Sequence, residues 1–218
     1  VVDQVDVSNI TSIRNFLDNH TLKAKDIDII ISNAAVKIPD SGMDNLNAVK
    51  STLDVNLFGP CNLVELFANS WIQRNYGHFV FISSMGRWHG IARTGAYNAS
   101  KAALSILCDS FALDLNSKKQ KSKVAVTVVE PGLIKTNMIE MSLLQKILSM
   151  CPKQFAARLV RKIKKKPKVI RFPFIFWALT VILTFGGFSI RNWVSFTLNS
   201  SKFSVPILTA LLNFSIAF

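Results

Sequence analysis

The amino-acid sequence predicts a doubly wound α/β fold built on a parallel sheet, and three observations favour it. Short apolar runs rich in β-branched and aromatic residues occupy residues 27–32, 78–84 and 124–132. Segments with helical spacing of their apolar residues alternate with them, at residues 9–19, 43–75 and 96–116. Strands that alternate with helices in this way are typical of a parallel sheet covered by helices on both faces.

Each strand-like run is apolar almost throughout, which is typical of a strand buried on both faces. Ser8 or Asn9 is expected to cap the first helix, because a side-chain oxygen there accepts hydrogen bonds from free backbone amides. Ligands of such sheets bind beyond the carboxyl ends of the strands. The polar residues that end the runs are therefore the first candidates for a site: Asp6, Asn33, Ser83, Ser84, Pro131 and Gly132.

The positive charge belongs to the C-terminal half of the chain. The formal net charge is +13, yet residues 1–116 hold 9 Lys and Arg against 11 Asp and Glu, whereas residues 117–218 hold 17 against 2. The two halves therefore carry −2 and +15. The basic segment lacks interleaved aromatic residues and runs into an apolar stretch, so we expect lipid rather than nucleic acid as its anionic partner.

The cysteines and the first residues indicate the compartment. Cys61, Cys108 and Cys151 are odd in number, far apart and without C-x-x-C spacing, which argues against a disulfide framework and against a zinc site. No metal is expected. The sequence opens without the basic head and apolar run of a secretory signal. A reducing, cytoplasmic compartment is the prediction.

Tyr97 and Lys101 are four residues apart in the predicted helix 96–116, so they lie one turn apart on the same face. A free phenol has a pKa of about 10, and a nearby ammonium favours the phenolate. The pair therefore predicts a proton donor to a carbonyl. Taken alone, such a pair is more often a half-buried ring beside a solvated charge, and the surrounding motifs decide between the two interpretations.

Four motifs in order resemble the short-chain dehydrogenase/reductase family, over roughly residues 1–137. Ser84, Tyr97 and Lys101 resemble its S-x12-Y-x3-K signature. Residues 32–35 (SNAA), 54–59 (DVNLFG) and 130–136 (EPGLIKT) resemble its N-N-A-G turn, the segment of its catalytic asparagine and its P-G-x-x-x-T loop. The resemblance implies a Rossmann-like fold and a nicotinamide cofactor.

The resemblance implies a catalytic role for each of four residues. Tyr97 is the expected general acid in ketone reduction and the base in alcohol oxidation, with its pKa lowered by Lys101, which also binds the nicotinamide ribose. Ser84 is expected to hold the substrate oxygen. The backbone carbonyl of Asn56 is expected to hold a water that links Lys101 to solvent.

The resemblance also implies the cofactor contacts. Asp6 and Val7 are expected at the adenine, and Asn33 and Ala34 along the adenosine ribose. Beside the nicotinamide it implies Tyr97, Lys101, Pro131, Gly132, Ile134 and Thr136. Ala35 and Ser32 depart from the family's N-N-A-G turn, because the family usually has glycine and asparagine there.

The family's pyrophosphate loop, T-G-x-x-x-G-x-G, is absent from the sequence. The expectation is therefore an N-terminally truncated chain, which begins at the family's third strand and lacks a major anion-binding element. The strand that selects between a ribose 2′-hydroxyl and a 2′-phosphate is lacking too, so the cofactor is NAD or NADP. Among the histidines, His20 and His78 are predicted to lie on the surface, and His89 is either a loop histidine, the more common case, or part of the substrate pocket.

The sequence divides into three regions: residues 1–140 as a partial catalytic domain, 141–171 as a basic amphipathic connecting segment, and 172–218 as an apolar extension. Residues 158–171 include eight basic residues, and nineteen uncharged residues follow at 172–190. As a helix these nineteen measure about 28 Å, close to the ~30 Å of a bilayer core. The extension either contacts membrane lipid or covers an apolar substrate pocket, and the positive-inside rule places the protein on the cytoplasmic face.

The favoured function is an NAD(P)-dependent oxidoreductase acting on a carbonyl or secondary alcohol of an apolar small molecule resembling a lipid or steroid. The alternative is a non-catalytic, membrane-associated Rossmann-like module that has lost cofactor binding. An assembly of several copies is left open, as are the substrate and the reaction direction.

Overall fold

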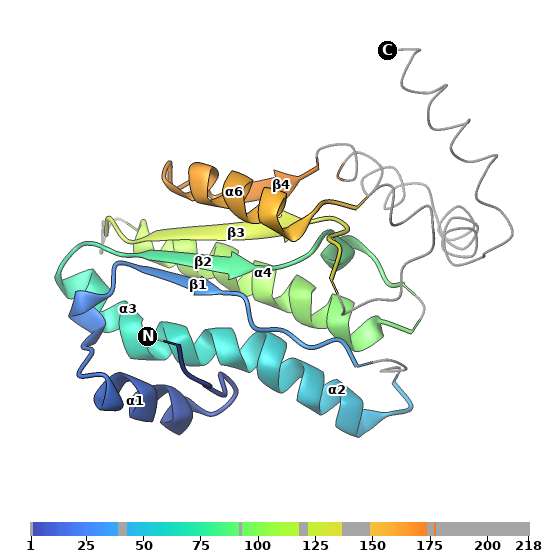
Figure 1. Cartoon of the computed structure of the whole chain (residues 1–218), viewed down its shortest axis with the longest axis horizontal. Helices are drawn as coiled ribbons and strands as arrows, with labels where there is room; N and C mark the ends of the chain where they lie inside the picture. Colours follow the sequence, from blue (N-terminus) through green and yellow to red (C-terminus); the bar gives the residue numbers. More distant parts are fainter. Residues whose placement is uncertain are drawn as a thin grey trace, which may run out of the picture.

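A computed structural model of the chain describes residues 2–38, 43–91, 93–117, 122–136, 149–173 and 177. Within these residues four parallel strands form one sheet in the order β1–β2–β3–β4, with bounds Ile29–Ser32, His78–Ile82, Ala125–Pro131 and Val169–Phe172 (Figure 1). The α-helices are α1 (Ile10–Asn19), α2 (Leu46–Leu53), α3 (Gly59–Gln73), α4 (Gly95–Leu115) and α6 (Pro152–Ile163). This Rossmann-like layering of a parallel sheet between helices confirms the predicted fold class.

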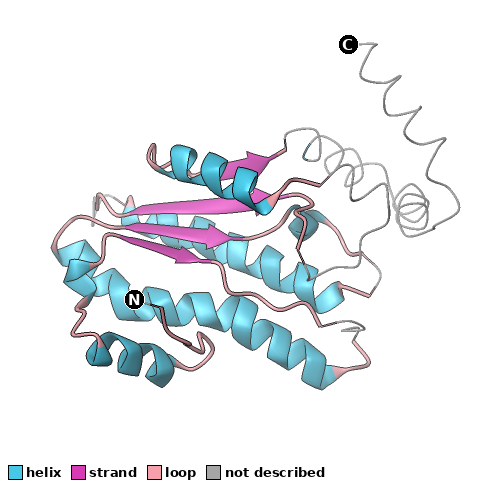
Figure 2. Cartoon of the chain, in the orientation of Figure 1, coloured by secondary structure: helices cyan, strands magenta, loops and turns pink. Residues whose placement is uncertain are grey.

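The direction of the side chains along β2 explains why helices cover both faces of the sheet (Figure 2). Phe79 and Phe81 point to one face and Val80 and Ile82 to the other, because successive strand residues alternate. All four are buried. The nearly continuous apolar run in the sequence thus corresponds to a strand buried on both sides, as predicted.

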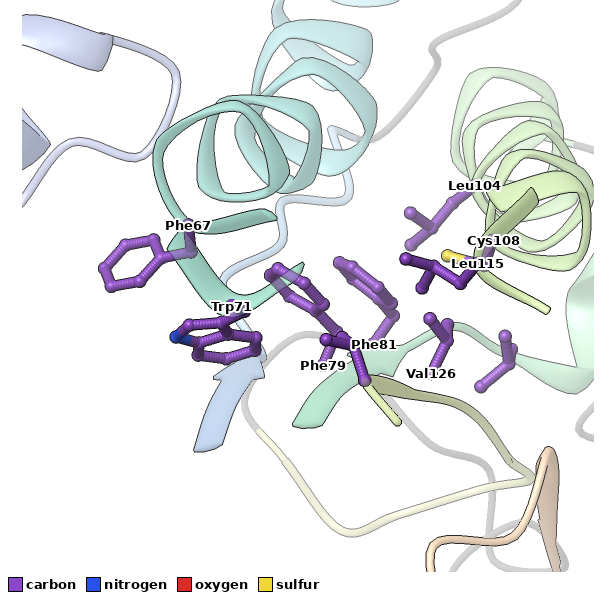
Figure 3. Packing of buried hydrophobic residues seen from close by; sticks show 10 residues of the cluster. Phe67, Trp71, Phe79, Phe81, Leu104, Cys108, Leu115 and Val126 are labelled. Atoms are coloured by element: carbon purple, nitrogen blue, oxygen red, sulfur yellow. The ribbon is translucent and has the colours of Figure 1, made fainter. Parts of the chain in front are cut away.

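The larger core lies between the sheet and helices α3 and α4 (Figure 3). Trp71 of α3 packs against Phe79 with ring centroids 4.3 Å apart, and its indole N–H donates to the Ala24 carbonyl at 3.0 Å. Leu104 and Cys108 complete this core from α4. Helix α4 is therefore fixed along its length, which in turn fixes the Tyr97 and Lys101 side chains that it carries.

Helix α6 covers the opposite face, where Leu159 and Ile163 pack on Val80, Val129 and Ile170. Strand β1 lies at the edge of the sheet. Its Ile29 and Ile31 are 48% and 45% exposed, whereas Ile30 packs against the α3–α4 core. In the described part of the chain, the face of β1 on the α6 side is therefore open to solvent.

The predicted helix 43–75 is divided by a turn of π-helix at Asp54–Phe58 (η2), which joins α2 to α3. The amide of Gly59 donates to the carbonyl of Asp54, five residues earlier. Single π turns inside helices occur frequently at functional sites. At the chain's first helix, Asn9 is the N-cap, and its side chain accepts from the Thr11 amide at 2.9 Å.

Two features differ from the sequence expectations. Strand β4 lies within the predicted connecting segment 141–171 and reaches Phe172, so the sheet extends past residue 140. The prediction that His78 lies on the surface is wrong, because β2 is an inner strand and His78 is 1% exposed. Its Nε2 lies 2.8 Å from the Thr127 hydroxyl.

Within the described ranges, no helix is both long and apolar enough to span a bilayer. The apolar extension at 172–218 lies outside the described residues except for Phe172, Pro173 and Trp177. The prediction of a membrane-contacting or pocket-covering extension therefore stays a prediction.

Candidate active site

The strands deliver the candidate residues to one edge of the sheet. Because all four strands are parallel, their carboxyl ends meet at the same edge. Two hydrogen bonds continue the ladder beyond the strands, from the Ser83 amide to the Val129 carbonyl (2.8 Å) and from the Gly132 amide to the Phe172 carbonyl (2.7 Å). The loops after β2 and β3 consequently leave the sheet side by side.

Tyr97, Ser84 and Lys101 are brought together at this edge. The Ser84 side chain lies near the Tyr97 hydroxyl and lowers the pKa of the phenol through hydrogen bonding. Lys101 lies one helical turn further along α4 with its Nζ 5.8 Å from the centroid of the Tyr97 ring. Lys101 is 2% exposed, and its Nζ donates to the Ile82 carbonyl at 2.8 Å.

The electrostatics of this cluster differ from the sequence expectation. Burial raises the pKa of Tyr97, and the hydrogen bond from Ser84 opposes that shift only in part. Burial also lowers the pKa of Lys101 to about 8. Desolvation of the phenol is the larger effect, while the ammonium donates to the Ile82 carbonyl, and the predicted lowering of the Tyr97 pKa is not found.

Ser84 is the N-cap of a short 3₁₀ turn, η3 (Met85–Trp88), and its Oγ accepts from the Gly86 amide at 3.0 Å. A β-carbon on Gly86 would lie 2.7 Å from Asn98 Oδ1, so the turn needs glycine to approach α4 this closely. Asn98 donates to the carbonyl of His89, the C-cap of this turn, at 3.3 Å, and to the Thr94 hydroxyl at 3.0 Å. Sequence reasoning assigned no role to Asn98, which holds the end of the turn to α4.

The two consecutive serines have different environments. Ser83 is buried, and its hydroxyl contacts the Lys101 carbonyl at 3.0 Å and the Ser105 hydroxyl at 2.8 Å. Ser83 therefore joins β2 to α4. Ser84 is only half-buried and its side chain lies near the Tyr97 hydroxyl, so it is the more accessible of the two serines.

Asn56 lies in the π turn η2 and is completely buried. Its side-chain amide accepts from the Val36 amide and donates to the Val36 carbonyl, both at 2.8 Å, and it also donates to Ser100 Oγ at 3.1 Å. Ser100 in turn donates to the Tyr97 carbonyl at 2.7 Å. The Asn56 side chain thus connects the segment after β1 to the tyrosine helix, whereas its predicted role in holding a water stays a prediction.

The predicted adenine contacts, Asp6 and Val7, lie before α1. The exposed Asp6 carboxylate accepts from the Ser8 hydroxyl at 2.7 Å, and this bond and one from the Ser8 amide lower its pKa. The Val7 carbonyl accepts from Asn62 of α3 at 2.9 Å. Their hydrogen bonds fix the start of the chain against α3 and do not reach the Tyr97 cluster.

The other predicted cofactor residues follow strands β1 and β3. Asn33 and Ala34 are exposed directly after β1, where a ligand at the sheet edge can reach them. After Pro131 and Gly132, Ile134 pairs with Met150 in an isolated parallel bridge, and Thr136 is exposed. These residues thus lie in the loops that leave the carboxyl edge of the sheet. Their contact with a cofactor stays a prediction.

Glu130 is a residue that sequence reasoning missed. It is completely buried at the end of β3, where one carboxylate oxygen accepts from Arg87 and the other from Arg171, both at 2.9 Å. The indole N–H of Trp88 donates to it at 3.3 Å. The sequence did offer one signal, a lone carboxylate at the end of an otherwise uncharged strand-like run. Its two arginine partners are far away in the sequence, so the pairing could not be predicted.

This carboxylate joins three elements around the site. Arg87 belongs to the turn η3 that Ser84 caps, and Arg171 is the neighbour of Glu130 across the β3–β4 ladder. Glu130 therefore holds the turn after Ser84 against the strand that leads to Pro131 and Gly132. For metals, the described residues contain no group of three or more potential ligands.

Comparison with known proteins gives the family. The profile of the short chain dehydrogenase family matches residues 1–146. An uncharacterized oxidoreductase of Mycobacterium bovis is 31% identical over 173 residues, covering 78% of this chain and 50% of that protein. A fatty acyl-CoA reductase of Acinetobacter baylyi is 32% identical over 148 residues, covering 66% of this chain and 49% of that protein.

A solved structure supports the same conclusion. A 4-hydroxyisoleucine dehydrogenase complexed with NADH is 26% identical and superposes with a TM-score of 0.63, covering 78% of each chain. The chain belongs to the short-chain dehydrogenase family, as its motifs predicted. It spans about half the length of the curated relatives that it matches.

Proposed function

We propose that this protein is an NAD(P)-dependent oxidoreductase that interconverts a carbonyl and a secondary alcohol on an apolar substrate, with Tyr97 as general acid and base. One observation carries the proposal: the Ser84 side chain is near enough to the Tyr97 hydroxyl to lower its pKa, and the buried Lys101 ammonium lies one turn away. Two neighbouring hydroxyls can both reach one substrate oxygen. When bound, the nicotinamide supplies or accepts the hydride.

The protein's own residues handle the oxygen and its proton. In reduction, Ser84 donates a hydrogen bond to the substrate oxygen and Tyr97 transfers its proton to that oxygen. Because burial raises its pKa, Tyr97 is fully protonated at neutral pH and ready to act as the acid. Lys101, with a pKa of about 8, is still largely charged at that pH and stabilises the tyrosinate that remains.

The residues present fit the nicotinamide end of such a cofactor. Lys101 has three N–H donors, of which the described structure uses one for the Ile82 carbonyl, so the others suit ribose hydroxyls. Asn33 and Ala34 are exposed at the same edge of the sheet. The NADH in the related dehydrogenase supports a nicotinamide cofactor, and the choice between NAD and NADP stays undetermined.

An apolar substrate is favoured by the sequence and by one relative. The residues that follow the sheet are rich in apolar side chains, and the fatty acyl-CoA reductase relative carries a name that implies a lipid substrate. We therefore propose a substrate with a long aliphatic or fused-ring skeleton.

Isotope transfer tests the proposal. The full chain is incubated with nicotinamide cofactor deuterated at C4 of the reduced ring, in each stereochemical form, and with a panel of aliphatic, aryl and steroidal ketones. The expected result is an alcohol that carries deuterium on the former carbonyl carbon. No transfer to any ketone, together with no binding of NADH or NADPH, would instead favour a non-catalytic Rossmann-like module.

A further inference from the structure

Helix α6 has two chemically different faces. Phe155, Leu159 and Ile163 face the sheet, where Leu159 and Ile163 are buried in the second core. On the outer face, Lys153, Ala157, Val160 and Lys164 follow one another at spacings of four, three and four residues, and all are exposed. One stripe of the helix and the turn after it thus present cations with small apolar residues between them.

The exposed cations continue from α6 through the turn into β4. We call this set the α6 basic surface; it comprises Lys153, Arg158, Arg161, Lys162, Lys164, Lys165, Lys166 and Lys168. Residues 149–173 contain no Asp or Glu. Like charges three and four residues apart destabilise a helix, so this concentration of charge opposes folding unless an anionic partner balances it.

The rest of the described molecule pairs several of its arginines. Arg14, Arg74, Arg87 and Arg171 each form an ion pair with an aspartate or glutamate. None of the eight cations of the α6 basic surface has such a pair within the described ranges. Two of them lie over aromatic rings, Lys162 over Phe172 at 4.6 Å and Lys166 over Tyr76 at 4.3 Å.

We propose that the α6 basic surface docks on an anionic lipid bilayer. Six of its eight cations are lysines, which act as point charges, whereas the planar fork of arginine is the group that suits bidentate recognition in nucleic acids. Val160 lies among these cations, is 50% exposed and offers apolar contact at the headgroup boundary. The nearby rings of Phe172 and Tyr76 are covered by ammonium groups and are not free to stack on nucleotide bases.

The surface is separate from the candidate active site. Helix α6 packs on one face of the sheet, and α4, which carries Tyr97 and Lys101, packs on the other. Docking through α6 therefore leaves α4 facing away from the bilayer. The anionic leaflet of a cell membrane is the cytoplasmic one, so this docking places the protein on the cytoplasmic face. The proposal does not depend on catalysis.

Vesicle sedimentation of the full chain tests the docking. Phosphatidylcholine vesicles with and without phosphatidylserine are compared at low and high salt, for the wild type and for the combined variant Arg158→Gln, Arg161→Gln, Lys164→Gln and Lys165→Gln. A matched control removes four exposed cations elsewhere: Arg14→Gln, Lys25→Gln, Lys50→Gln and Lys123→Gln. Thermal unfolding of each variant verifies that it is folded.

The expected effect is large because the charges act together. Each cation near an anionic leaflet contributes a factor of about five to binding, so the loss of four reduces partitioning onto anionic vesicles by roughly several hundred-fold. The control keeps wild-type partitioning within about tenfold. Equal binding to neutral and anionic vesicles, or equal losses in the two variants, would overturn the proposal. Tighter binding to an oligonucleotide than to anionic vesicles would replace lipid with nucleic acid.

Discussion

Acidification is expected to destabilise this protein through His78. Burial, helped by the nearby charge of Lys166, lowers the pKa of His78 from 6.5 to about 4. A histidine whose pKa is lower in the folded state binds a proton more tightly in the unfolded state. Acid therefore shifts the equilibrium toward unfolding. The stabilisation is therefore fully present above pH 6.5 and is lost as the pH falls toward 4.

The structure gives the magnitude. The two pKa values differ by about 2.5, and each pH unit of difference corresponds to ~1.36 kcal/mol, so the free energy of unfolding should fall by about 3 kcal/mol across this window. Asp3 and Asp6 also have lowered pKa values, but their contributions are lost only below about 3.8, outside the window. The Thr127 hydroxyl donates to the Pro167 carbonyl and therefore accepts from His78 Nε2 at 2.8 Å, so the added proton enters at Nδ1 of a ring that burial keeps neutral.

Urea unfolding followed by tryptophan fluorescence, at a series of pH values from 7 to 4, measures this loss. His78→Gln cannot titrate and keeps an amide near Thr127, so its unfolding free energy should change little with pH even if it is lower throughout. His20→Gln, at the more exposed histidine beside Asp3, is the matched control and should keep the wild-type slope. A wild-type slope that survives in His78→Gln would refute the assignment.

Four further outcomes are expected. Alcohol oxidation should rise about tenfold per pH unit through neutrality, because Tyr97 must lose its proton and its pKa is raised; a rate that is flat with pH contradicts this role. Lys101→Ala should weaken binding of the reduced cofactor, measured by fluorescence titration, as well as turnover; loss of only one of the two assigns it a single role. Glu130→Gln should lower the unfolding free energy by about 2–4 kcal/mol because it breaks a buried charge pair, whereas Glu65→Gln in an exposed pair should stay within ~0.5 kcal/mol of the wild type. Asn56→Ala should cost about 3 kcal/mol in the same unfolding assay, since it leaves the Val36 amide and carbonyl without their partner, and an effect below ~1 kcal/mol counts against that link.

The sequence predicted the elements whose signals are local. The runs that became β1, β2 and β3 are short and apolar, and the N-cap Asn9 precedes a clear helical period. The sequence did not show β4, because this strand is four residues long, follows a dense basic segment and contains Arg171. On this edge strand the half-buried arginine is neutralised by Glu130, forty-one residues earlier and its neighbour on β3.

The candidate site shows the same limit. The order and spacing of Ser84, Tyr97 and Lys101 indicated the cluster that the structure assembles. The pKa of Tyr97 depends on how deeply α4 is buried and on where the Lys101 ammonium points, and neither can be derived from a four-residue spacing. Contacts between residues distant in sequence, such as Asn56 with Val36, needed the fold itself.

Comparison of two tyrosine variants tests the central claim most directly. Tyr76 also lies beside a lysine, with the Lys166 Nζ 4.3 Å from its ring centroid, but it precedes β2 rather than joining the carboxyl edge. Turnover of a ketone that accepts deuterium from the reduced cofactor is measured for both variants, with cofactor affinity from fluorescence titration. Tyr97→Phe should reduce turnover by at least ~10²-fold with cofactor affinity largely kept, and Tyr76→Phe should remain within a few-fold of the wild type. Tyr97→Phe with turnover within a few-fold of the wild type would remove Tyr97 from the chemistry and contradict the account.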